Sequence, residues 1–336
     1  MSKIILAHGE GGKLTRELLE SKIVPFIDNS VLQTLTDSAN LGEVPEGEIA
    51  LTTDAYIVSP IFFPGGDIGS LSISGTVNDL TMVGAKPLAI SSALIIEEGF
   101  KTSDLEKIMT SASSAAKEVG VRIVAGDTKV LPKGKGDQIF IVTSGVGVIE
   151  KNRKLDDRFI EEGDAIVVSG PIAMHGATIA AIRHNLKGKK LSSDCAPLWG
   201  LVNHLVESGI KPRSMHDPTR GGVATLLNEV AKRTKMAVRI EEARIPVSPE
   251  VRGVTELLGL DPLYLACEGR FVGFFRKEDA EKAVSVLNAH PRGKDAAIIG
   301  EIGKRENGSA PVTLITKFGS DRPIDELSGL QLPRIC

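Results

Sequence analysis

The sequence of 336 residues has few aromatic side chains and no strong excess of charge of either sign. Phe, Trp and Tyr make up 4% of the residues, which argues against a surface that stacks nucleic acid bases. The formal net charge is −3, so the chain offers no basic field for nucleic acid or an anionic membrane. No apolar run approaches the roughly 18 residues that would span a bilayer. We therefore expect neither nucleic acid nor a membrane among the partners.

Cysteine is also scarce, because only Cys195, Cys267 and Cys336 occur. They form neither CxxC pairs nor a disulfide framework, and the first residues lack the features of a secretory signal. A reducing cytoplasm is the expected location. Cys195 and Cys267 lie among apolar residues and are predicted to be core thiols. Cys336 is the last residue, where a thiol makes a poor core residue but a good reactive handle, although chance placement is the alternative.

Two segments that mix strands and helices follow one another, separated by a charged stretch at residues 150–162. In the first, β-branched runs predict strands and longer periodic runs predict helices: strands at Ile49–Val58, Val121–Ala125 and Ile139–Ile149, and helices at Gly69–Val83 and Leu105–Val119. The second shows the same mixture, with strands at 165–169, 237–240, 270–275, 296–302 and 311–316, and helices at about 177–184, 197–207, 223–232 and 279–289. We predict an α+β fold with domains at residues 1–150 and 151–318, followed by a mobile tail at 319–336.

A glycine-rich stretch, HGEGGK, runs from His8 to Lys13 and precedes a helical pattern. Glycines let the backbone approach a phosphate, and a helix N-terminus supplies free N–H groups. The stretch is not a Walker A loop, which would need glycine at Ala7 and serine or threonine at Leu14. The residues alone leave a phosphate-binding loop and a flexible turn as equal alternatives.

Aspartates recur beside small residues in the first segment, at positions 37, 54, 79 and 127. Mg²⁺ prefers oxygen ligands and usually joins a few carboxylates to nucleotide phosphates. A single aspartate is more often a turn or cap residue, but four within small polar clusters favour a metal site. The stretch DPTRGG, which begins at Asp217, could bind phosphate or metal, or could form a cap and turn.

Two further residues are candidates for proton transfer. Lys129 follows a predicted turn at Gly126–Thr128, and Glu268 lies between a helical stretch and an apolar strand. A lysine and a glutamate in one cleft could exchange protons if their pKa values were tuned. Most residues of both types are solvated surface, so the residues alone do not decide this.

Together the motifs HGEGGK, TTDA, VNDLTMVGAKPL, GDTK, SGPIAMHG, HDPTRGG, DPLYLACEG and LPRIC resemble the HypE family of hydrogenase maturation factors. That family belongs to the superfamily of aminoimidazole ribonucleotide synthetase and selenophosphate synthetase. The resemblance covers nearly the whole chain, and the closing PRIC is its specific element. It implies two PurM-like domains, a homodimer, and ATP with Mg²⁺ bound near the dimer interface.

The matched motifs also imply roles for particular residues. The implied nucleotide-binding residues are His8, Gly9, Gly11, Gly12, Lys13, Thr53, Asn78, Gly126, Asp127 and Thr128. The implied metal ligands are Asp37, Asp54, Asp79 and Asp217. Lys129 and Glu268 are implied to handle protons.

The resemblance implies a carrier role for Cys336. This residue would receive a carbamoyl group from the carbamoyltransferase HypF, and ATP-dependent dehydration would convert that group to a thiocyanate. The cyano group would pass to iron on a HypC–HypD complex, toward a [NiFe]-hydrogenase active site.

Two alternatives remain open at this point. One is another enzyme of the superfamily, such as selenophosphate synthetase, whose reactive cysteine or selenocysteine lies near the N-terminal loop. This chain has no cysteine before Cys195, which argues against it. The other is a non-catalytic adaptor whose tail docks on a partner, although an adaptor has no need for so many acidic residues in glycine-flanked loops.

Overall fold

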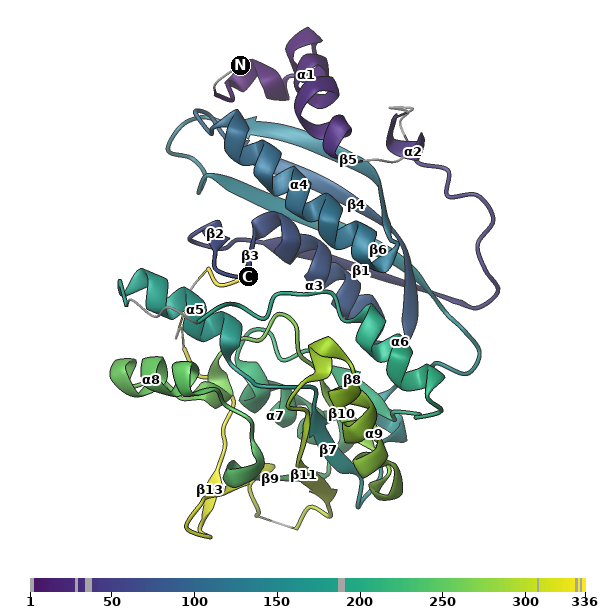
Figure 1. The fold of residues 1–336 in the computed structure, drawn as a ribbon, viewed down its shortest axis with the longest axis vertical. Helices are drawn as coiled ribbons and strands as arrows, with labels where there is room; N and C mark the ends of the chain where they lie inside the picture. Colours follow the sequence, from purple (N-terminus) through teal and green to yellow (C-terminus); the bar gives the residue numbers. More distant parts are fainter. Residues whose placement is uncertain are drawn as a thin grey trace.

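The computed structural model describes residues 3–27, 30–33, 38–186, 191–306, 308–329, 332 and 334–336. Two halves lie along the long axis of the molecule, the amino-terminal half at the top of Figure 1 and the carboxyl-terminal half below it. Each half combines strands with helices, as the sequence predicted. Within the described ranges, no helix has the length and apolar character needed to cross a membrane.

The amino-terminal half is built on a four-stranded sheet in the order β1-β6-β4-β5, in which only β4 and β5 run parallel. Its strands are β1 Glu48–Tyr56, β4 Ala85–Glu97, β5 Arg122–Leu131 and β6 Ile139–Ile149, with a hairpin of β2 Phe62–Phe63 and β3 Gly66–Asp67. Its helices and turns are η1 Leu6–Gly9, α1 Lys13–Leu18, η2 Leu19–Ile23, η3 Val24–Phe26, α2 Ser30–Gln33, α3 Ile68–Met82 and α4 Thr102–Val119. Helices α3 and α4 cover one face of this sheet (Figure 1).

Helix α3 is buried on nearly every side, which explains its many small residues. It begins at Asp67, whose Oδ1 accepts hydrogen bonds from the N–H groups of Gly69 and Ser70 at 2.8 and 3.0 Å. A Cβ at Gly69 would lie 2.2 Å from the Ile108 carbonyl oxygen of α4, and one at Gly75 would lie 2.3 Å from the Tyr56 hydroxyl. Glycine therefore lets α3 pack closely against both α4 and β1.

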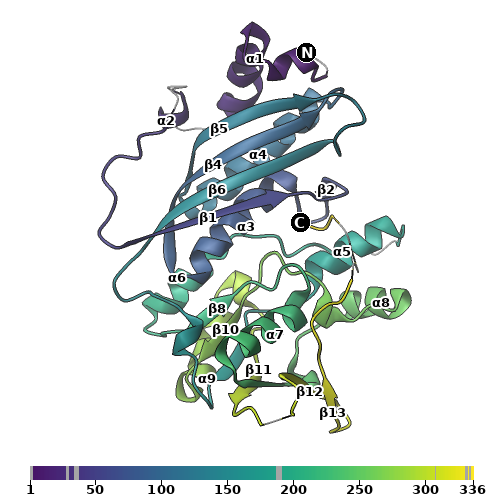
Figure 2. The same ribbon diagram turned by 180° about the vertical axis from the view of Figure 1, so that it is seen from behind.

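In the part of the chain that the structure describes, no helix covers the other face of this sheet, which faces the viewer in Figure 2. Along β1 the exposed residues alternate with more buried ones, as expected for a strand with one covered face. The uncovered face carries apolar side chains, because Ile49 is 61% exposed and Leu51 is 74% exposed. Exposed apolar side chains on a sheet face favour association with another apolar surface.

The carboxyl-terminal half contains a seven-stranded sheet in the order β13-β12-β9-β11-β7-β10-β8, with β12 and β9 parallel and the other pairs antiparallel. Its strands are β7 Ala165–Val168, β8 Ser214–His216, β9 Ala237–Glu241, β10 Val272–Phe275, β11 Ala297–Gly303, β12 Val312–Ile315 and β13 Asp321–Pro323. Its helices are α5 Met174–Arg183, α6 Trp199–Glu207, α7 Gly222–Thr234, α8 Pro249–Leu258 and α9 Lys277–Ala289, with short turns at η4 Asp157–Phe159, η5 Glu242–Arg244, η6 Pro262–Tyr264 and η7 Pro291–Gly293.

Both faces of strand β7, in the interior of this second sheet, are buried. Ile166 and Val168 pack in the core that includes α5 and α7, whereas Val167 packs with α6 and α9. Successive residues of a strand point to opposite faces, so helices cover both sides of β7. This arrangement agrees with the continuous apolar sequence of the strand.

Three local predictions were wrong. The sequence predicted no strand at β4, where Pro87 interrupts the pattern and the register shifts at a bulge between Pro87 and Ala89. The stretch Gly126–Thr128 is not a turn, because β5 continues to Leu131 in parallel pairing with β4. The predicted mobile tail begins with an ordered strand, since β13 pairs with β12 and Ile324 is buried behind it. A strand of three residues is too short to give a periodic signal.

Candidate active site

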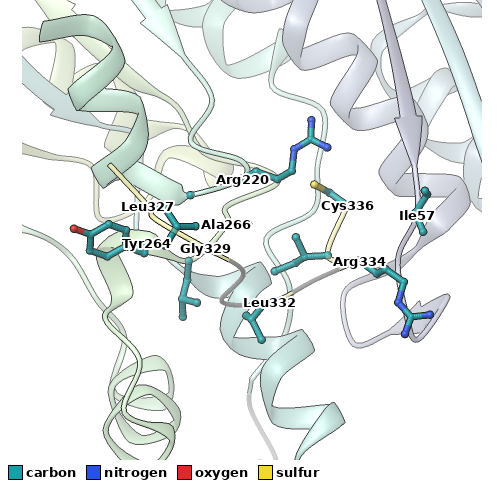
Figure 3. Close-up of a pocket in the computed structure, with 12 residues that line it drawn as sticks. Ile57, Arg220, Tyr264, Ala266, Leu327, Gly329, Leu332, Arg334 and Cys336 are labelled. Carbon is teal, nitrogen blue, oxygen red and sulfur yellow. The ribbon is translucent and has the colours of Figure 1, made fainter. Parts of the chain in front are cut away.

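The end of the chain enters the space between the two halves. The C mark lies between the amino-terminal sheet and α5 in both views (Figures 1 and 2). Ile335 is buried and Cys336 is half-buried. Cys336 lines a cavity of about 380 Å³ together with Ile57, Arg220, Tyr264 and Leu332, among others. Figure 3 shows the sulfur of Cys336 pointing toward the guanidinium of Arg220.

A buried carboxyl group, that of Glu268, accompanies this thiol. Glu268 is 2% exposed, and its Oε1 has no hydrogen-bond partner among the described residues. Burial raises the pKa of Glu268 well above its ordinary value, the negative charges of Asp217 and Asp194 raise it further, and Arg220 opposes them. The Cys336 thiol donates a hydrogen bond to this carboxyl group. One oxygen of a buried acid therefore remains available to a further donor.

The thiol is neutral in this position. Burial raises the pKa of Cys336 far above its ordinary value, and the charge of Glu268 adds to the effect, while Arg220 opposes it. A neutral thiol is a weak nucleophile. The docked sulfur is therefore suited to present a group that it already carries, and poorly suited to acquire one.

The backbone around Glu268 is fixed by two side chains from other elements. Asp194 accepts hydrogen bonds from the N–H groups of Glu268 and Gly269 at 3.3 and 3.2 Å. Asn78 of α3 donates to the Glu268 carbonyl oxygen at 3.4 Å, and its Oδ1 accepts from the Leu198 N–H at 2.8 Å. Asn78 was predicted to bind nucleotide, which stays a prediction, but in this structure its amide is committed to the backbone. Asp194 lies in no sequence motif that would indicate its role.

Two of the predicted aspartates, Asp54 and Asp217, lie close enough to Glu268 for their charges to raise its pKa, and Asp79 lies close to both of them. Asp54 lies on β1 and Asp79 on α3, where the Thr52 hydroxyl donates to Asp79 Oδ2 at 2.6 Å. Burial raises the pKa of Asp79, and the charge of Asp54 raises it further. Burial and the charge of Asp79 raise the pKa of Asp217 to about 7. These carboxylates repel one another, so a cation placed among them would be bound favourably.

The aspartates fit a shared metal better than a metal held by protein alone. Among the described residues, no three His, Cys, Asp or Glu side chains converge tightly enough to enclose a metal ion. Mg²⁺ is usually held by one or two carboxylates together with substrate phosphates, and it keeps several waters. One or two of Asp54, Asp79 and Asp217 would be enough for such a site, and their role as metal ligands stays a prediction. The fourth predicted ligand, Asp37, lies outside the described residues.

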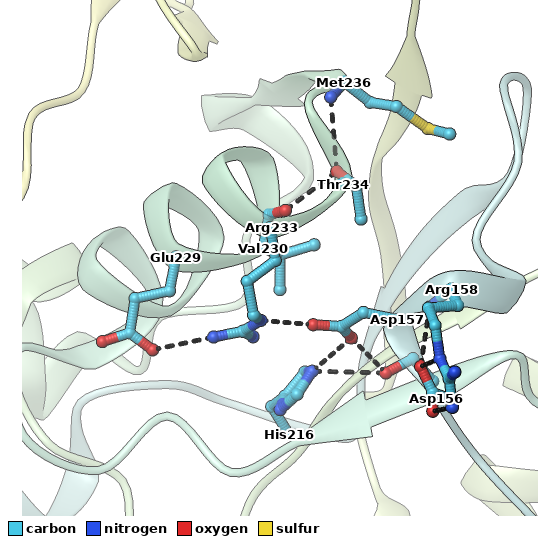
Figure 4. A network of polar contacts seen from close by, with 10 residues as sticks. Asp156, Asp157, Arg158, His216, Glu229, Val230, Arg233, Thr234 and Met236 are labelled. Atoms are coloured by element: carbon cyan, nitrogen blue, oxygen red, sulfur yellow. Dashed lines mark hydrogen bonds and ion pairs between the residues drawn. The ribbon is translucent and has the colours of Figure 1, made fainter.

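A polar network surrounds His216, the residue before Asp217 (Figure 4). His216 ends β8 and donates from Nε2 to Asp157 Oδ1 at 2.7 Å. Asp157 also accepts from the Ser214 hydroxyl and from Arg233 Nε, each at 2.6 Å. Burial raises the pKa of Asp157, but its hydrogen bonds and the charge of His216 outweigh burial and lower it well below its ordinary range. These charged hydrogen bonds thus hold the end of β8, which directly precedes Asp217.

The remaining predicted residues gather elsewhere, at β5. Turn η1 contains His8 and packs on this strand, because a Cβ at Gly9 would lie 2.5 Å from the Val130 nitrogen. Lys129 pairs with Asp127 at 3.0 Å, and both side chains are exposed. The other predicted residues of this group are Gly11, Gly12, Lys13, Gly126 and Thr128. Strand β5 is the edge of the sheet opposite to β1, so one chain holds two separate groups of predicted site residues.

Thr53 belongs to neither group in this chain. Its hydroxyl donates to the Thr143 carbonyl oxygen at 3.1 Å and accepts from Ser144 at 2.9 Å, along the β1–β6 pair. Lys129 and Glu268 likewise do not share a site within one chain, because Lys129 is bound to Asp127 on β5. The structure brings together Cys336, Glu268, Asp54, Asp79 and Asp217. It also places Arg220 beside them, a residue of the DPTRGG stretch for which the sequence indicated no role.

The fold defines a class of protein. Residues 36–149 match the N-terminal domain of AIR synthase related protein, and residues 161–313 match the C-terminal domain of the same family. The chain is 44% identical to carbamoyl dehydratase HypE of Cupriavidus necator over 99% of this chain and 95% of that protein. It therefore belongs to the HypE family of carbamoyl dehydratases.

Solved structures agree with this assignment. A crystal structure of hydrogenase maturation protein HypE in complex with ATP superposes with a TM-score of 0.94 at 41% identity, covering 99% of both chains. A chain from a crystal structure of a HypE–HypF complex superposes with a TM-score of 0.79 at 42% identity, covering 94% of this chain and all of that one.

Proposed function

We propose that this protein dehydrates a carbamoyl group carried on the sulfur of Cys336 to a thiocyanate, at the expense of ATP. The observation that supports this most strongly is the docked thiol beside Glu268, a buried acid with one oxygen free of partners. The test is mass spectrometry of the carboxyl-terminal peptide. Carbamoylated protein given Mg²⁺ and ATP is expected to lose the mass of one water from that peptide.

The chemistry needs the carbamoyl oxygen to leave, and an amide-type oxygen is a poor leaving group. ATP supplies a phosphoryl group to this oxygen, and ADP departs as the new P–O bond forms. The carbon–oxygen bond then breaks with phosphate as the leaving group, and the nitrogen loses both of its protons. The product is S–C≡N, and the sulfur–carbon bond of Cys336 is retained throughout.

We assign the base to Glu268. A base with a pKa near or above the working pH accepts a proton readily, which a raised pKa provides. Its free oxygen would be available to the nitrogen of a carbamoyl group carried on Cys336, since the free thiol already lies beside the same carboxyl group. Arg220, toward which the sulfur points, would neutralise negative charge on the departing oxygen.

The neutral docked thiol supports two positions of the tail, one in which Cys336 is loaded and one in which the loaded group reacts. We propose that Cys336 takes up its carbamoyl group while the tail is released, where the thiol regains an ordinary pKa. HypF is the proposed donor, because a solved relative is described as a HypE–HypF complex. A HypC–HypD complex is the proposed acceptor of the cyano group, on the basis of the family resemblance.

We further propose a homodimer through the uncovered sheet face. A two-fold axis along the strands would place β5 of one protomer over β1 of the other, since these strands form opposite edges of the sheet. The group at β5, with Lys129 and the glycine-rich loop, would then adjoin the partner's acidic cleft. This arrangement would let Lys129 serve proton transfer across the interface and would complete the ATP site.

Substituting Leu51 with glutamate is expected to break this dimer. Leu51 is 74% exposed on the uncovered face, and a two-fold contact would bury the new charge twice. Light scattering coupled to size exclusion should report the mass of two chains for the native protein and of one chain for Leu51→Glu. Leu257→Glu, at a 68% exposed position on α8, is the matched control and should stay dimeric. A single-chain mass for the native protein would rule the dimer out.

Substituting Asp79 with asparagine is expected to abolish ATP-dependent turnover while the protein stays folded. The change removes a metal ligand, but the amide oxygen can still accept the hydrogen bond from Thr52. Because burial raises the pKa of Asp79, its charge is unfavourable without metal, and the variant should melt at the same temperature or higher. Calorimetric titration with Mg²⁺–ATP tests whether the metal ligand needed for turnover is lost. A thermal melt tests whether the melting temperature is unchanged or higher. The exposed Asp295→Asn variant is the control, and nucleotide binding equal to it would contradict the assignment.

The alternatives fare less well. The described N-terminal loop carries no cysteine for a selenophosphate synthetase reaction. A pure adaptor would have no use for an acid such as Glu268, whose burial is unfavourable and whose free oxygen points to a ligand.

A further inference from the structure

The last residues of the chain are held by their main chain. His175 Nε2 donates a hydrogen bond to the Ile335 carbonyl oxygen at 2.7 Å, and the Arg183 guanidinium donates to the Arg334 carbonyl oxygen. The Ser59 N–H donates to that same oxygen of Arg334 at 3.2 Å. Two successive carbonyl groups next to the carrier residue are thereby fixed, and the Cys336 side chain takes no part in these contacts.

The ring of His175 is held in one orientation and one tautomer. A carbonyl oxygen only accepts, so the proton on Nε2 is fixed by the contact with Ile335. The opposite nitrogen, Nδ1, accepts from the Ser193 hydroxyl at 2.8 Å, and Ser193 Oγ in turn accepts from the Cys195 N–H at 3.0 Å. The ring is fully buried and packs edge-on against Phe63, with 5.2 Å between ring centroids. Such a ring is a preformed donor, with little freedom left to lose when the tail docks.

The contacts come from both halves of the molecule. His175 and Arg183 lie two turns apart on α5, in the carboxyl-terminal half. Ser59 belongs to the amino-terminal half, and its carbonyl oxygen also accepts from Arg183 Nε at 2.8 Å. The Arg334 side chain forms an ion pair with Asp137, which is in the amino-terminal half too. A docked tail therefore joins the two halves.

We propose that His175 and Arg183 form a main-chain clamp that holds the tail in the docked position and thereby sets how long Cys336 stays beside Glu268. The proposal rests on the proposed function. His175 and Arg183 are positioning residues, because they contact the main chain of the tail. A clamp that binds carbonyl groups does not depend on whether the sulfur carries hydrogen, a carbamoyl group or a cyano group. It can therefore dock the same tail at every stage and release it without selecting for the load.

Four variants of the full-length protein test the clamp. His175→Phe keeps the ring and removes the donor, whereas His175→Gln keeps an Nε2 donor. Arg183→Met removes the second donor. His184→Phe changes the exposed histidine directly after the same helix and is the matched control.

Two rates are measured for each variant. The first is alkylation of Cys336 by iodoacetamide, followed on the carboxyl-terminal peptide. The second is loss of water from carbamoylated protein in a single turnover with Mg²⁺ and ATP. We expect alkylation to rise up to five-fold in His175→Phe and in Arg183→Met, the factor for one net hydrogen bond. Water loss should slow in proportion to the docked fraction that remains, with the dependence on ATP concentration unchanged. His175→Gln should recover part of both effects, and His184→Phe should match the native protein.

The outcomes separate the clamp from the proposed function. Native alkylation rates of Cys336 in both His175→Phe and Arg183→Met would overturn the clamp. If His175→Phe does not fold, the result for Arg183→Met alone decides. Faster alkylation of Cys336 together with a native rate of water loss would show that the clamp does not influence catalysis. If native carbamoylated protein loses no water with ATP, the proposed function fails, and the alkylation rates still decide whether the clamp exists.

Discussion

Replacing Cys336 with alanine is expected to eliminate thiocyanate formation completely. The sulfur is the atom to which the reacting carbon stays bonded, so no other group on the tail can take its place. Because Cys336 is half-buried at the end of the chain and not part of a packed core element, the fold should tolerate the change. Incubation with the carbamoyl donor, Mg²⁺ and ATP, followed by mass spectrometry of the intact protein, would show neither the carbamoyl adduct nor the dehydrated product.

Two controls accompany this experiment. Cys195→Ala removes a different thiol and should still show one adduct and the subsequent loss of one water. Cys336→Ser keeps the length and shape of the tail, yet an alcohol is a far weaker nucleophile than a thiol. Any thiocyanate found on Cys336→Ala protein would overturn the carrier role.

Replacing Glu268 with glutamine should have the second largest effect, a loss of about 10²–10⁴-fold in the rate of dehydration, the usual range for a general base. The amide still fits the buried space and can accept the hydrogen bond from the Cys336 thiol, so the tail should still dock. It cannot take up a proton from the nitrogen. Single-turnover rates on carbamoylated protein measure the loss directly, and a native rate in Glu268→Gln would remove this residue from the mechanism.

The same variant carries a prediction about stability and pH. Burial raises the pKa of Glu268 in the folded protein, so between its ordinary value and the raised value the folded state binds more protons than the unfolded state. The free energy of unfolding of the native protein therefore falls as the pH rises through that window, and the full contribution is present only below the ordinary glutamate pKa. Glu268→Gln lacks this titration and should melt at a higher temperature than the native protein near pH 8, with the difference vanishing toward pH 4.

The rate should follow pH in the opposite sense. A larger fraction of Glu268 is ionised as the pH rises toward its raised pKa, so dehydration by the native protein should accelerate with pH in the same window. Equal melting temperatures of the two proteins at pH 8 would mean that Glu268 is not an unfavourably buried charge. A pH-independent native rate would argue against its role as base.

Much of the cleft was predictable because its residues occupy regular elements. Asp54 lies within a predicted strand and Asp79 within a predicted helix of small residues, and the packing of α3 on β1 brings them together. The roles proposed for Cys336 and Glu268 come from the family resemblance of motifs at the end of the chain and before β10, and they stay predictions. The order of the strands was not predictable, since Pro87 obscured β4, which lies between β5 and β6.

The docking of the tail could not be predicted from side-chain patterns. Its contacts are made to the carbonyl groups of Arg334 and Ile335, and every residue type carries such a group. His175 and Arg183 are two turns apart on a helix whose pattern otherwise resembles that of a core element. Asp194 was equally hidden, because it binds backbone N–H groups from a loop with no regular spacing.

Strand β13 limits where the carrier sulfur can travel. The chain is tied to β12 up to Pro323, and Ile324 is buried, so the reach of the Cys336 sulfur is set by the twelve residues that follow Ile324. Fully extended at 3.3–3.6 Å per residue, these residues reach roughly 40 Å from the sheet edge. Any enzyme that loads or unloads the thiol must therefore bring its own catalytic centre inside that radius, on the same side of the molecule. Lengthening the segment would widen that radius, whereas shortening it far enough would keep Cys336 from reaching Glu268.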